Sequence, residues 1–285
     1  MRQDNERESD NIEDRRGMSM GGKMLTGGGL GTVALAVIAL FMGVDPSIVL
    51  SVLGDNILAP QQQTRQAVPS NPQDEKLKKF MSVVLASTED AWGDIFQKSG
   101  SRYVPPKLVL YSGQIESACG FGEAAMGPFY CPGDQKLYLD MDFFNELANR
   151  HNAPGDFAQA YVVAHEVGHH VQKLLGTADQ VQQAMQRGNE VSNNQLQVRM
   201  ELQADCYAGV WANHANEMRQ ILEPGDIEEA LGAASSVGDD ILQKQTRGYV
   251  VPESFTHGSS AQRMQWFGIG AKTGDPKKCN TFSAR

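Results

Sequence analysis

Three of the six histidines in this 285-residue chain, His165, His169 and His170, lie within six positions of one another, in the stretch AYVVAHEVGHHVQ (160–172). The residues around them are small or branched and apolar, and this pattern predicts a largely buried helix. Histidine and glutamate are costly to bury unless they are paired or coordinate a metal. The stretch therefore indicates a candidate metal site.

His165 to His169 read H-E-V-G-H. Residues four apart on a helix differ by about 40° around its axis, so both imidazoles project from one face, one turn apart. This geometry allows His165 and His169 to bind one zinc ion, and Glu166 lies beside them, where it can take a proton from water. His170 is turned about 100° from His169. We expect it to be a packed, hydrogen-bonded histidine.

A catalytic zinc ion needs three protein ligands and one open position. The zincins that use glycine and histidine three and six residues after the second histidine are excluded, because Gln172 and Leu175 stand there. The stretch RMELQADCYAGVWA (199–212) offers Glu201 and Asp205 at i, i+4. We expect Glu201 to bind the metal and Asp205 to accept the second ring N–H of a ligand histidine. Two solvated acids on an amphipathic helix are the alternative, which their apolar neighbours disfavour.

The elements that must position these residues can be read from hydrophobic periodicity. Helices are expected at 76–98, 141–150, 157–175, 195–220, 225–245 and after Ser259, and strands at 107–112 and 135–140. These elements predict an α+β fold, zincin-like and mostly helical, with a small β-sheet. We expect the strand at 135–140 to be the sheet edge that aligns an extended substrate by backbone hydrogen bonds.

The composition divides the chain into four parts. Residues 1–23 are polar and charged, which predicts a disordered tail. Residues 24–44 carry no charge and are long enough to cross a bilayer as a helix, so we expect a transmembrane anchor. Residues 45–73 are expected to form a linker, and residues 74–285 the zinc metallopeptidase domain.

The flanking charges suggest an orientation for the anchor. Arg15, Arg16 and Lys23 precede it, and no lysine or arginine follows it until Arg65. The positive-inside rule then keeps the N-terminus in the cytoplasm and places the domain outside it, as in a single-pass protein of the cytoplasmic (inner) membrane. A cleaved signal peptide and a buried helix of a soluble fold are the alternatives. No small-x-small cleavage site follows the apolar run.

The four cysteines all follow the apolar segment, as expected for an oxidising compartment. Cys119 and Cys131 bracket a short loop that a disulfide would close, and by elimination Cys206 would pair with Cys279. A zinc knuckle is disfavoured because the sequence has no C-x-x-C pair. Free buried thiols remain an alternative.

The charge balance excludes one class of partner. The chain has 34 acidic residues against 25 lysines and arginines, a formal net charge of −9. Phosphate backbones require a basic surface, so the sequence predicts no nucleic-acid partner.

The H-E-x-x-H helix followed by E-x-x-x-D resembles the gluzincin class of zinc peptidases. SACG…GPFYCP…KLYLD, DFAQAYVVAHEVGHHVQ, ELQADCYAGVWA and FTHGSSAQRMQWF resemble the bacterial family called putative neutral zinc metallopeptidases, over nearly the whole chain. This resemblance implies His165 and His169 as ligands and Glu166 as general base. The class-level similarity adds Glu201 as the third ligand. Gluzincins usually stabilise the oxyanion with a late histidine or tyrosine, which implies His257, or Tyr249 next.

These features predict a membrane-anchored zinc metalloendopeptidase that acts on peptides or proteins outside the cytoplasm. Its cofactor would be Zn²⁺, held by His165, His169 and Glu201. One alternative is a catalytically idle zinc-binding module that binds a partner at the membrane. Another is a different zinc hydrolase, such as an amidase with a cysteine ligand, which would leave Glu201 and Asp205 without a role.

Overall fold

The computed structural model describes residues 1–3, 6–17, 71–123, 127–150 and 153–283. Met1–Arg16 belong to the same compact unit as the chain from Pro69 onwards. The expected anchor at 24–44 and nearly all of the expected linker lie outside the described residues. Among the described residues, no helix combines the length and apolar character that a membrane crossing requires.

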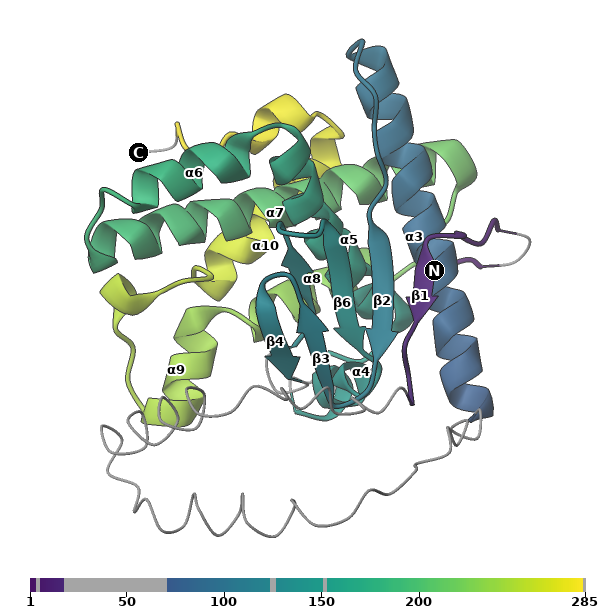
Figure 1. Ribbon diagram of the computed structural model, residues 1–285, viewed down its shortest axis with the longest axis horizontal. Coiled ribbons are helices and arrows are strands. Elements are labelled where there is room, and N and C mark those ends of the chain that lie inside the picture. The colour runs from purple at the N-terminus through teal and green to yellow at the C-terminus, as the bar shows by residue number, and fades with distance from the viewer. Residues whose placement is uncertain (4–5, 18–70, 124–126, 151–152, 284–285) are drawn as a thin grey trace, which may run out of the picture. The chain divides into compact units, whose positions relative to one another are not determined.

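The unit contains a four-stranded sheet in the order β1-β2-β6-β5 (Figure 1). Its strands are β1 (Ile12–Asp14), β2 (Lys107–Tyr111), β6 (Lys136–Asp140) and β5 (Phe129–Cys131). The first three run parallel, and β5 is antiparallel to β6. β6 is therefore an interior strand, and the prediction that residues 135–140 form a substrate-binding edge is wrong. The sheet edge on that side is the short strand β5.

Both faces of the two long strands are covered, because successive side chains point to opposite sides of a strand. Leu108 and Leu110 of β2 face the main hydrophobic core together with the helices. Val109 and Tyr111 face a smaller apolar cluster that includes Ile115. Ile115 belongs to a separate antiparallel pair, β3 (Gln114–Ser117) with β4 (Gly120–Glu123).

Eight α-helices and two 3-10 turns complete the described residues. They are α3 (Pro72–Lys98), α4 (Phe143–Asn149), α5 (Asp156–Leu174), α6 (Thr177–Met185), α7 (Glu190–Arg219), α8 (Asp226–Ser236), α9 (Asp239–Arg247), α10 (Ser260–Thr273), η2 (Pro252–Ser254) and η3 (Pro276–Cys279). The single helix expected over 225–245 is two helices, because α8 ends at Ser236 and Gly238 caps the start of α9. The α+β class, mostly helical with small sheets, is confirmed. The structure adds α6, which the sequence did not predict.

The long helices α7 and α10 approach each other closely at two glycines. A Cβ on Gly270 would lie 1.9 Å from the Cys206 carbonyl oxygen, and one on Gly209 would lie 2.1 Å from the Phe267 carbonyl oxygen. Only residues without a Cβ allow this approach. A capping box starts each helix, Asn189 with Ser192 in α7 and Ser259 with Gln262 in α10.

The prediction that residues 1–23 form a disordered tail is wrong for the described residues 1–3 and 6–17. β1 pairs with β2 in parallel register, and the α-amino group of Met1 lies 2.9 Å from Asp156 Oδ1 and 3.1 Å from Asp226 Oδ1. The composition rule treats charged side chains as solvated, but here they are paired within the fold.

Both predicted disulfides are confirmed. Cys119 is bonded to Cys131, and Cys206 is bonded to Cys279. The second bond joins α7 to η3, near the C-terminus, and both of its cysteines are fully buried. It therefore braces the helix that carries Glu201 and Asp205.

Candidate metal centre

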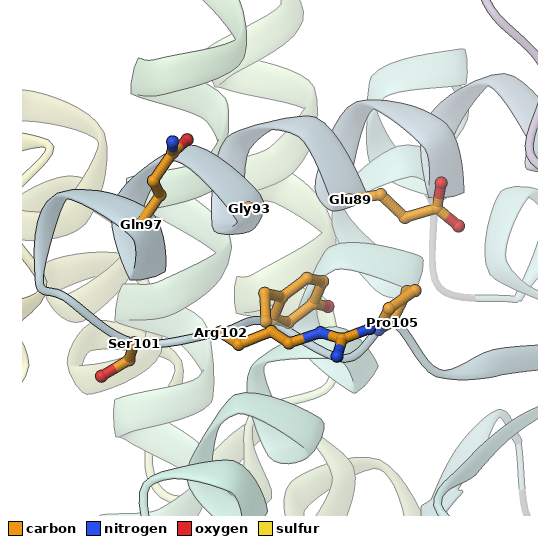
Figure 2. A pocket seen from close by; sticks show the side chains of 7 residues that line it. Glu89, Gly93, Gln97, Ser101, Arg102 and Pro105 are labelled. Atoms are coloured by element: carbon orange, nitrogen blue, oxygen red, sulfur yellow. The ribbon is translucent and has the colours of Figure 1, made fainter.

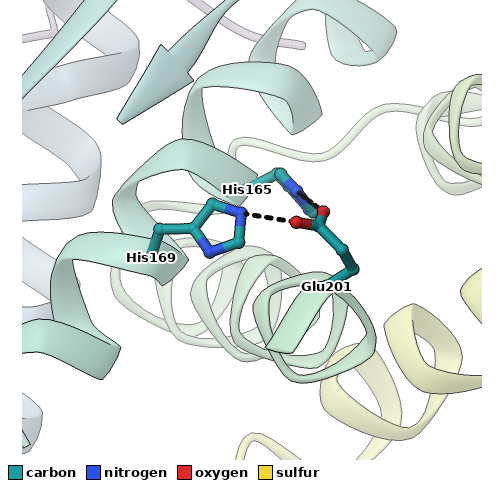
Figure 3. A group of neighbouring side chains, drawn as sticks. All are labelled: His165, His169 and Glu201. Atoms are coloured by element: carbon teal, nitrogen blue, oxygen red, sulfur yellow. Dashed lines mark hydrogen bonds and ion pairs between the residues drawn. The ribbon is translucent and has the colours of Figure 1, made fainter. Parts of the chain in front are cut away.

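His165, His169 and Glu201 converge between α5 and α7 (Figure 3). His165 Nε2 lies 3.1 Å from Glu201 Oε2, and His169 Nε2 lies 3.6 Å from Glu201 Oε1. Each side chain offers one ligand atom, and all three atoms lie within 4.8 Å of one another. The two imidazoles come from one face of α5, as the four-residue spacing predicts.

The distances in this group are of the size found around a zinc ion. With zinc–ligand bonds of about 2.1 Å, neighbouring ligand atoms of a tetrahedral site are about 3.4 Å apart. The observed 3.1 and 3.6 Å run to the two different oxygens of Glu201, and each is close to that value. The charge fits as well, since the carboxylates of Glu166, Glu201 and Asp205 outnumber the Arg263 guanidinium by two. A divalent cation would balance this excess if both imidazoles are neutral.

The glycine within the motif allows α7 to come this close to α5. A Cβ on Gly168 would lie 2.9 Å from the Ala204 carbonyl oxygen and 3.0 Å from its Cα. Ala204 lies one turn beyond Glu201 on α7. Any larger residue at 168 would therefore push the Glu201 helix away from the histidines.

A partner for the second ring nitrogen fixes each histidine. His165 Nδ1 lies 2.8 Å from Asp205 Oδ1, the contact expected from the sequence. His169 Nδ1 lies 2.9 Å from Gln172 Oε1, and the Gln172 amide donates in turn to the Met200 carbonyl of α7. Because these acceptors engage Nδ1 of each imidazole, Nε2 is the atom of each that would bind a metal.

Glu201 and Asp205 have further partners that the sequence did not indicate. Gln197, one turn before Glu201, donates to its Oε1 at 2.9 Å. Arg263 of α10 binds Asp205 with two hydrogen bonds, Nε to Oδ2 at 2.8 Å and Nη2 to Oδ1 at 2.9 Å. Tyr161 donates its hydroxyl hydrogen to the same Oδ1. Asp205 is fully buried and is held by residues of α5 and α10 at once.

The electrostatics of these groups are strongly coupled. Burial on its own would lower the pKa of His165, but the Asp205 charge and the hydrogen bonds that His165 donates to Asp205 and Glu201 raise it to about 10. Burial on its own would raise the pKa of Asp205, but the charges of Arg263 and His165 lower it to about 2. Burial alone would also raise the pKa of Glu201, but His169 and His165 lower it well below its ordinary value. Asp205 and Glu201 are therefore ionised at neutral pH, as a metal ligand and its partner must be.

Glu166 lies beside this group without a fixed partner. Its side chain makes no hydrogen bond or ion pair within the described part of the chain. Burial raises the pKa of its carboxyl above the ordinary value, against the opposing charges of His169 and His165. A carboxylate with a raised pKa and an unengaged oxygen is suited to accept a proton at near-neutral pH.

His257 is held by a carboxylate at the start of α9. Its Nδ1 lies 3.2 Å from Asp239 Oδ1, and Asp239 Oδ2 accepts the backbone N–H of His257 at 2.6 Å. The side chain is half exposed. The hydrogen bond that His257 donates to Asp239 raises the pKa of His257, burial opposes this, and the charge of Glu201 raises the pKa further. Asp239, which the sequence did not single out, thus orients a histidine that lies within electrostatic range of the metal group.

The other histidines and Tyr249 do not join the metal group. His170 is buried, with Nε2 2.7 Å from the Val104 carbonyl oxygen and Nδ1 3.1 Å from the Tyr130 hydroxyl. His214 is half-buried, with Nε2 2.8 Å from the Gly274 carbonyl oxygen. Tyr249 is 62% exposed. His151 lies outside the described residues.

A second acidic group is already partnered. Asp156, Asp226 and Glu229 also bring ligand-type oxygens together. The α-amino group of Met1 pairs with Asp156 and Asp226, and Glu229 accepts the backbone N–H of Phe157. This group is therefore satisfied by the protein itself.

The surface has two hollows, one along α3 and one between α7 and α10. One, of about 380 Å³, lies along α3 (Figure 2), where Glu89, Gly93 and Gln97 form a row opposite Arg102 and Pro105. It contains no residue of the metal group. The other, of about 560 Å³, lies between α7, the segment 252–259 and α10. Leu202, which follows Glu201 on α7, lines this second hollow, and no residue of the metal group does.

Comparison with known proteins identifies the family. A family model described as "Putative neutral zinc metallopeptidase" matches residues 1–282. The chain therefore belongs to this family, as the sequence motifs predicted.

Its relatives include bacterial proteins of similar length. The protein named "Uncharacterized protein YpfJ" of Escherichia coli is 49% identical over 290 residues, which cover 99% of both chains. An uncharacterized protein of Mycobacterium tuberculosis is 43% identical over 263 residues, which cover 86% of this chain and 85% of the relative. No solved structure gives a significant match.

Proposed function

We propose that this protein is a zinc-dependent endopeptidase that hydrolyses peptide bonds in peptides or proteins. The observation that carries the proposal is the convergence of His165, His169 and Glu201, with the unengaged Glu166 carboxylate beside them. Two imidazoles, one carboxylate and an open position are the donor set of a catalytic zinc site. A bound zinc ion would supply a Lewis acid for the scissile carbonyl and an acidified water molecule.

The chain's own residues have separate tasks in this proposal. Glu166 accepts the proton of the attacking water and delivers it to the leaving amine. Asp205 and Gln172 keep the two imidazoles in the tautomer and orientation that expose Nε2. Arg263 holds Asp205 in place from the opposite side.

His257 is the proposed oxyanion donor, supported by its pairing with Asp239. A protonated imidazole near the Glu201 carboxylate can donate a hydrogen bond to the negative charge that develops on the carbonyl oxygen. We expect His257→Ala to retain metal and fold while turnover falls by roughly 10²–10³-fold, the loss typical of one such donor. Loss of bound metal together with activity would contradict this role and leave the exposed Tyr249 as the next candidate.

Substrate alignment is assigned to β5 in place of β6. β5 packs against α5, and within the described residues it pairs on one side only, with β6. An extended peptide can add to such an edge through backbone hydrogen bonds. The hollow beside Leu202, lined also by Val198, Phe255 and Trp266, offers an apolar site for a substrate side chain.

We also propose that the domain lies outside the cytoplasm. Its support is the pair of disulfides, which persist in oxidising compartments. Contact of the uncharged, apolar residues 24–44 with the bacterial cytoplasmic membrane remains part of the proposal.

The decisive experiment measures zinc content and cleavage of an unstructured protein by the full chain and by Glu166→Gln. We expect one zinc ion per chain in both, and a roughly 10²–10⁴-fold lower rate in the variant, since only the base is removed. Glu217→Gln is the matched control, because Glu217 is exposed on the far part of α7 and makes no contact with the group. It should cleave at the unaltered rate.

The alternatives predict other results. An idle zinc-binding module would hold zinc and cleave nothing with Glu166 intact. Full zinc content in Glu201→Ala, with loss of zinc in Asp205→Ala, would exchange the roles of these two carboxylates.

A further inference from the structure

The segment Glu6–Arg16 is fastened along α3 by side chains from several of its residues. Glu89 of α3 accepts hydrogen bonds from Arg7, Ser9 and Asn11, the first at 2.9 Å and the last at 2.8 Å. Arg7 also reaches Asp90 at 2.8 Å. One carboxylate thus fixes three residues of the segment to the helix.

The same segment completes the sheet. The Leu108 amide donates to the Asn11 carbonyl at 2.9 Å, and the Arg15 amide donates to the Leu110 carbonyl at 2.8 Å. Glu13 reaches across β2 to Lys136 of β6, with Oε1 2.9 Å from Nζ. Without these contacts the edge of β2 would expose unpaired backbone groups.

These contacts cannot form through a bilayer, whose hydrocarbon core alone is about 30 Å thick. A single crossing anywhere between residues 17 and 71 would leave the segment on one side and the domain on the other. We infer that Glu6–Arg16 and the metal-binding domain lie on the same side of the membrane. The expected arrangement, with the N-terminus in the cytoplasm and the domain outside, is incompatible with this docking.

Both arginines behind that expectation have other partners in the structure, and Lys23 lies outside the described residues. Arg15 pairs with Glu13 at 2.7 Å, and Arg16 pairs with Asp14 at 2.6 Å and with Glu75 of α3 at 2.8 Å. Counting lysines and arginines near an apolar segment treats such side chains as free cationic anchors. Here each arginine is instead paired with a carboxylate of the same unit.

Side-specific labelling of single introduced thiols tests the inference directly. All four native cysteines are in disulfides, so Asp10→Cys and Gln183→Cys each add one free thiol, both at exposed positions. Gln183, on α6, reports the side of the domain, and Asp10 reports the side of the segment. The full-length protein in spheroplasts is treated with a membrane-impermeant maleimide, and labelling in detergent-denatured samples gives the total for each thiol.

We expect the same labelled fraction at both positions. Labelling of Gln183→Cys in intact spheroplasts, with Asp10→Cys protected until lysis, would overturn the inference. Protection of both until lysis would uphold the shared side but contradict the extracytoplasmic location proposed for the domain. The two proposals therefore fail separately, and neither outcome depends on peptidase activity.

Glu89→Gln tests the docking itself. Weakening the contacts to Arg7, Ser9 and Asn11 should release the segment, so the Leu108 amide should lose protection in hydrogen exchange of the purified full chain. Glu116→Gln, at an exposed position on β3, is the control and should leave that amide protected. Equal protection of the Leu108 amide in both variants would show that Glu89 does not fasten the segment.

Discussion

Two charged clusters in this protein are built in opposite ways. Between α5, α7 and α10, a few charges are buried, and each one depends on a specific partner, as Asp205 depends on Arg263 and His165. Along α3 and β2, many charges of Glu6–Arg16 pair at the partly exposed surface. Breaking a buried pair is costly because the remaining charge is not solvated by water. Each exposed pair contributes little to the free energy of unfolding. The first cluster therefore fixes geometry, and the second holds a segment by the number of its contacts.

Removal of one arginine from each cluster gives the largest expected contrast. Arg263→Met leaves the Asp205 carboxylate buried without its charged partner, which should lower the free energy of unfolding by about 3–5 kcal/mol. Zinc affinity should also fall by roughly 10–100-fold, since Asp205 orients His165.

The control for this contrast is Arg16→Met, which removes an arginine from the surface cluster. It should cost about 0–1 kcal/mol and leave zinc affinity unchanged. Denaturant unfolding and chelator competition measure both quantities. Similar losses in the two variants would remove the distinction, and partial recovery of zinc affinity in Arg263→Lys would show that the charge matters as well as the paired hydrogen bonds.

Substitution of glycines on α10 tests whether the protein depends on the close approach of α7 and α10. Gly270→Ala places a Cβ against the Cys206 carbonyl, and such overpacking should cost about 1–3 kcal/mol. Gly268, two residues earlier on α10, has open space around its Cβ position. Gly268→Ala should therefore stabilise the protein by about 0.4–1 kcal/mol through the unfolded chain. Thermal unfolding measures both variants. If Gly270→Ala and Gly268→Ala shifted the unfolding temperature in the same direction, the close contact at Gly270 would not explain the effect.

Acid should weaken the surface cluster, with the smallest of these effects. Burial on its own would raise the pKa of Glu13, but hydrogen bonds from Lys136, Arg15 and Lys107 lower it to about 2. A group with a lowered folded-state pKa stabilises the fold above its ordinary pKa and loses that contribution as pH falls through the folded value. Docking should therefore weaken between about pH 4.5 and pH 2. Hydrogen exchange of the Leu108 amide measures this, and Glu13→Gln should flatten the dependence.

The buried cluster was largely predictable because most of its residues come from local patterns. His165, Glu166 and His169 share one helix, and Glu201 with Asp205 repeat the four-residue spacing on a second. The residues that could not be predicted lie far along the chain from their partners or belong to no recognisable motif. Arg263 reaches Asp205 from 58 residues further along the chain, and Asp239 reaches His257 only because α9 begins there.

The surface cluster was not predictable from composition. Residues 1–23 contain few large apolar side chains, and that scarcity is typical of disorder. The segment is ordered by partners that lie far away in sequence, such as Glu89 and Leu108. The strand β5 escaped prediction for a related reason, because three residues are too few to show an alternating pattern. The interior position of β6 follows from β1 and β5, neither of which the sequence predicted.

The docked segment also has a consequence for the order in which the chain matures on the ribosome. Glu6 pairs with Arg219, 213 residues later. At a synthesis rate of about 5–20 residues per second, roughly 10–40 s pass between the emergence of these two side chains. During that interval β1 can pair with β2, but Glu6 still lacks its partner because Arg219 has not yet been synthesised. The first part of the chain to be translated is thus among the last to be fully secured.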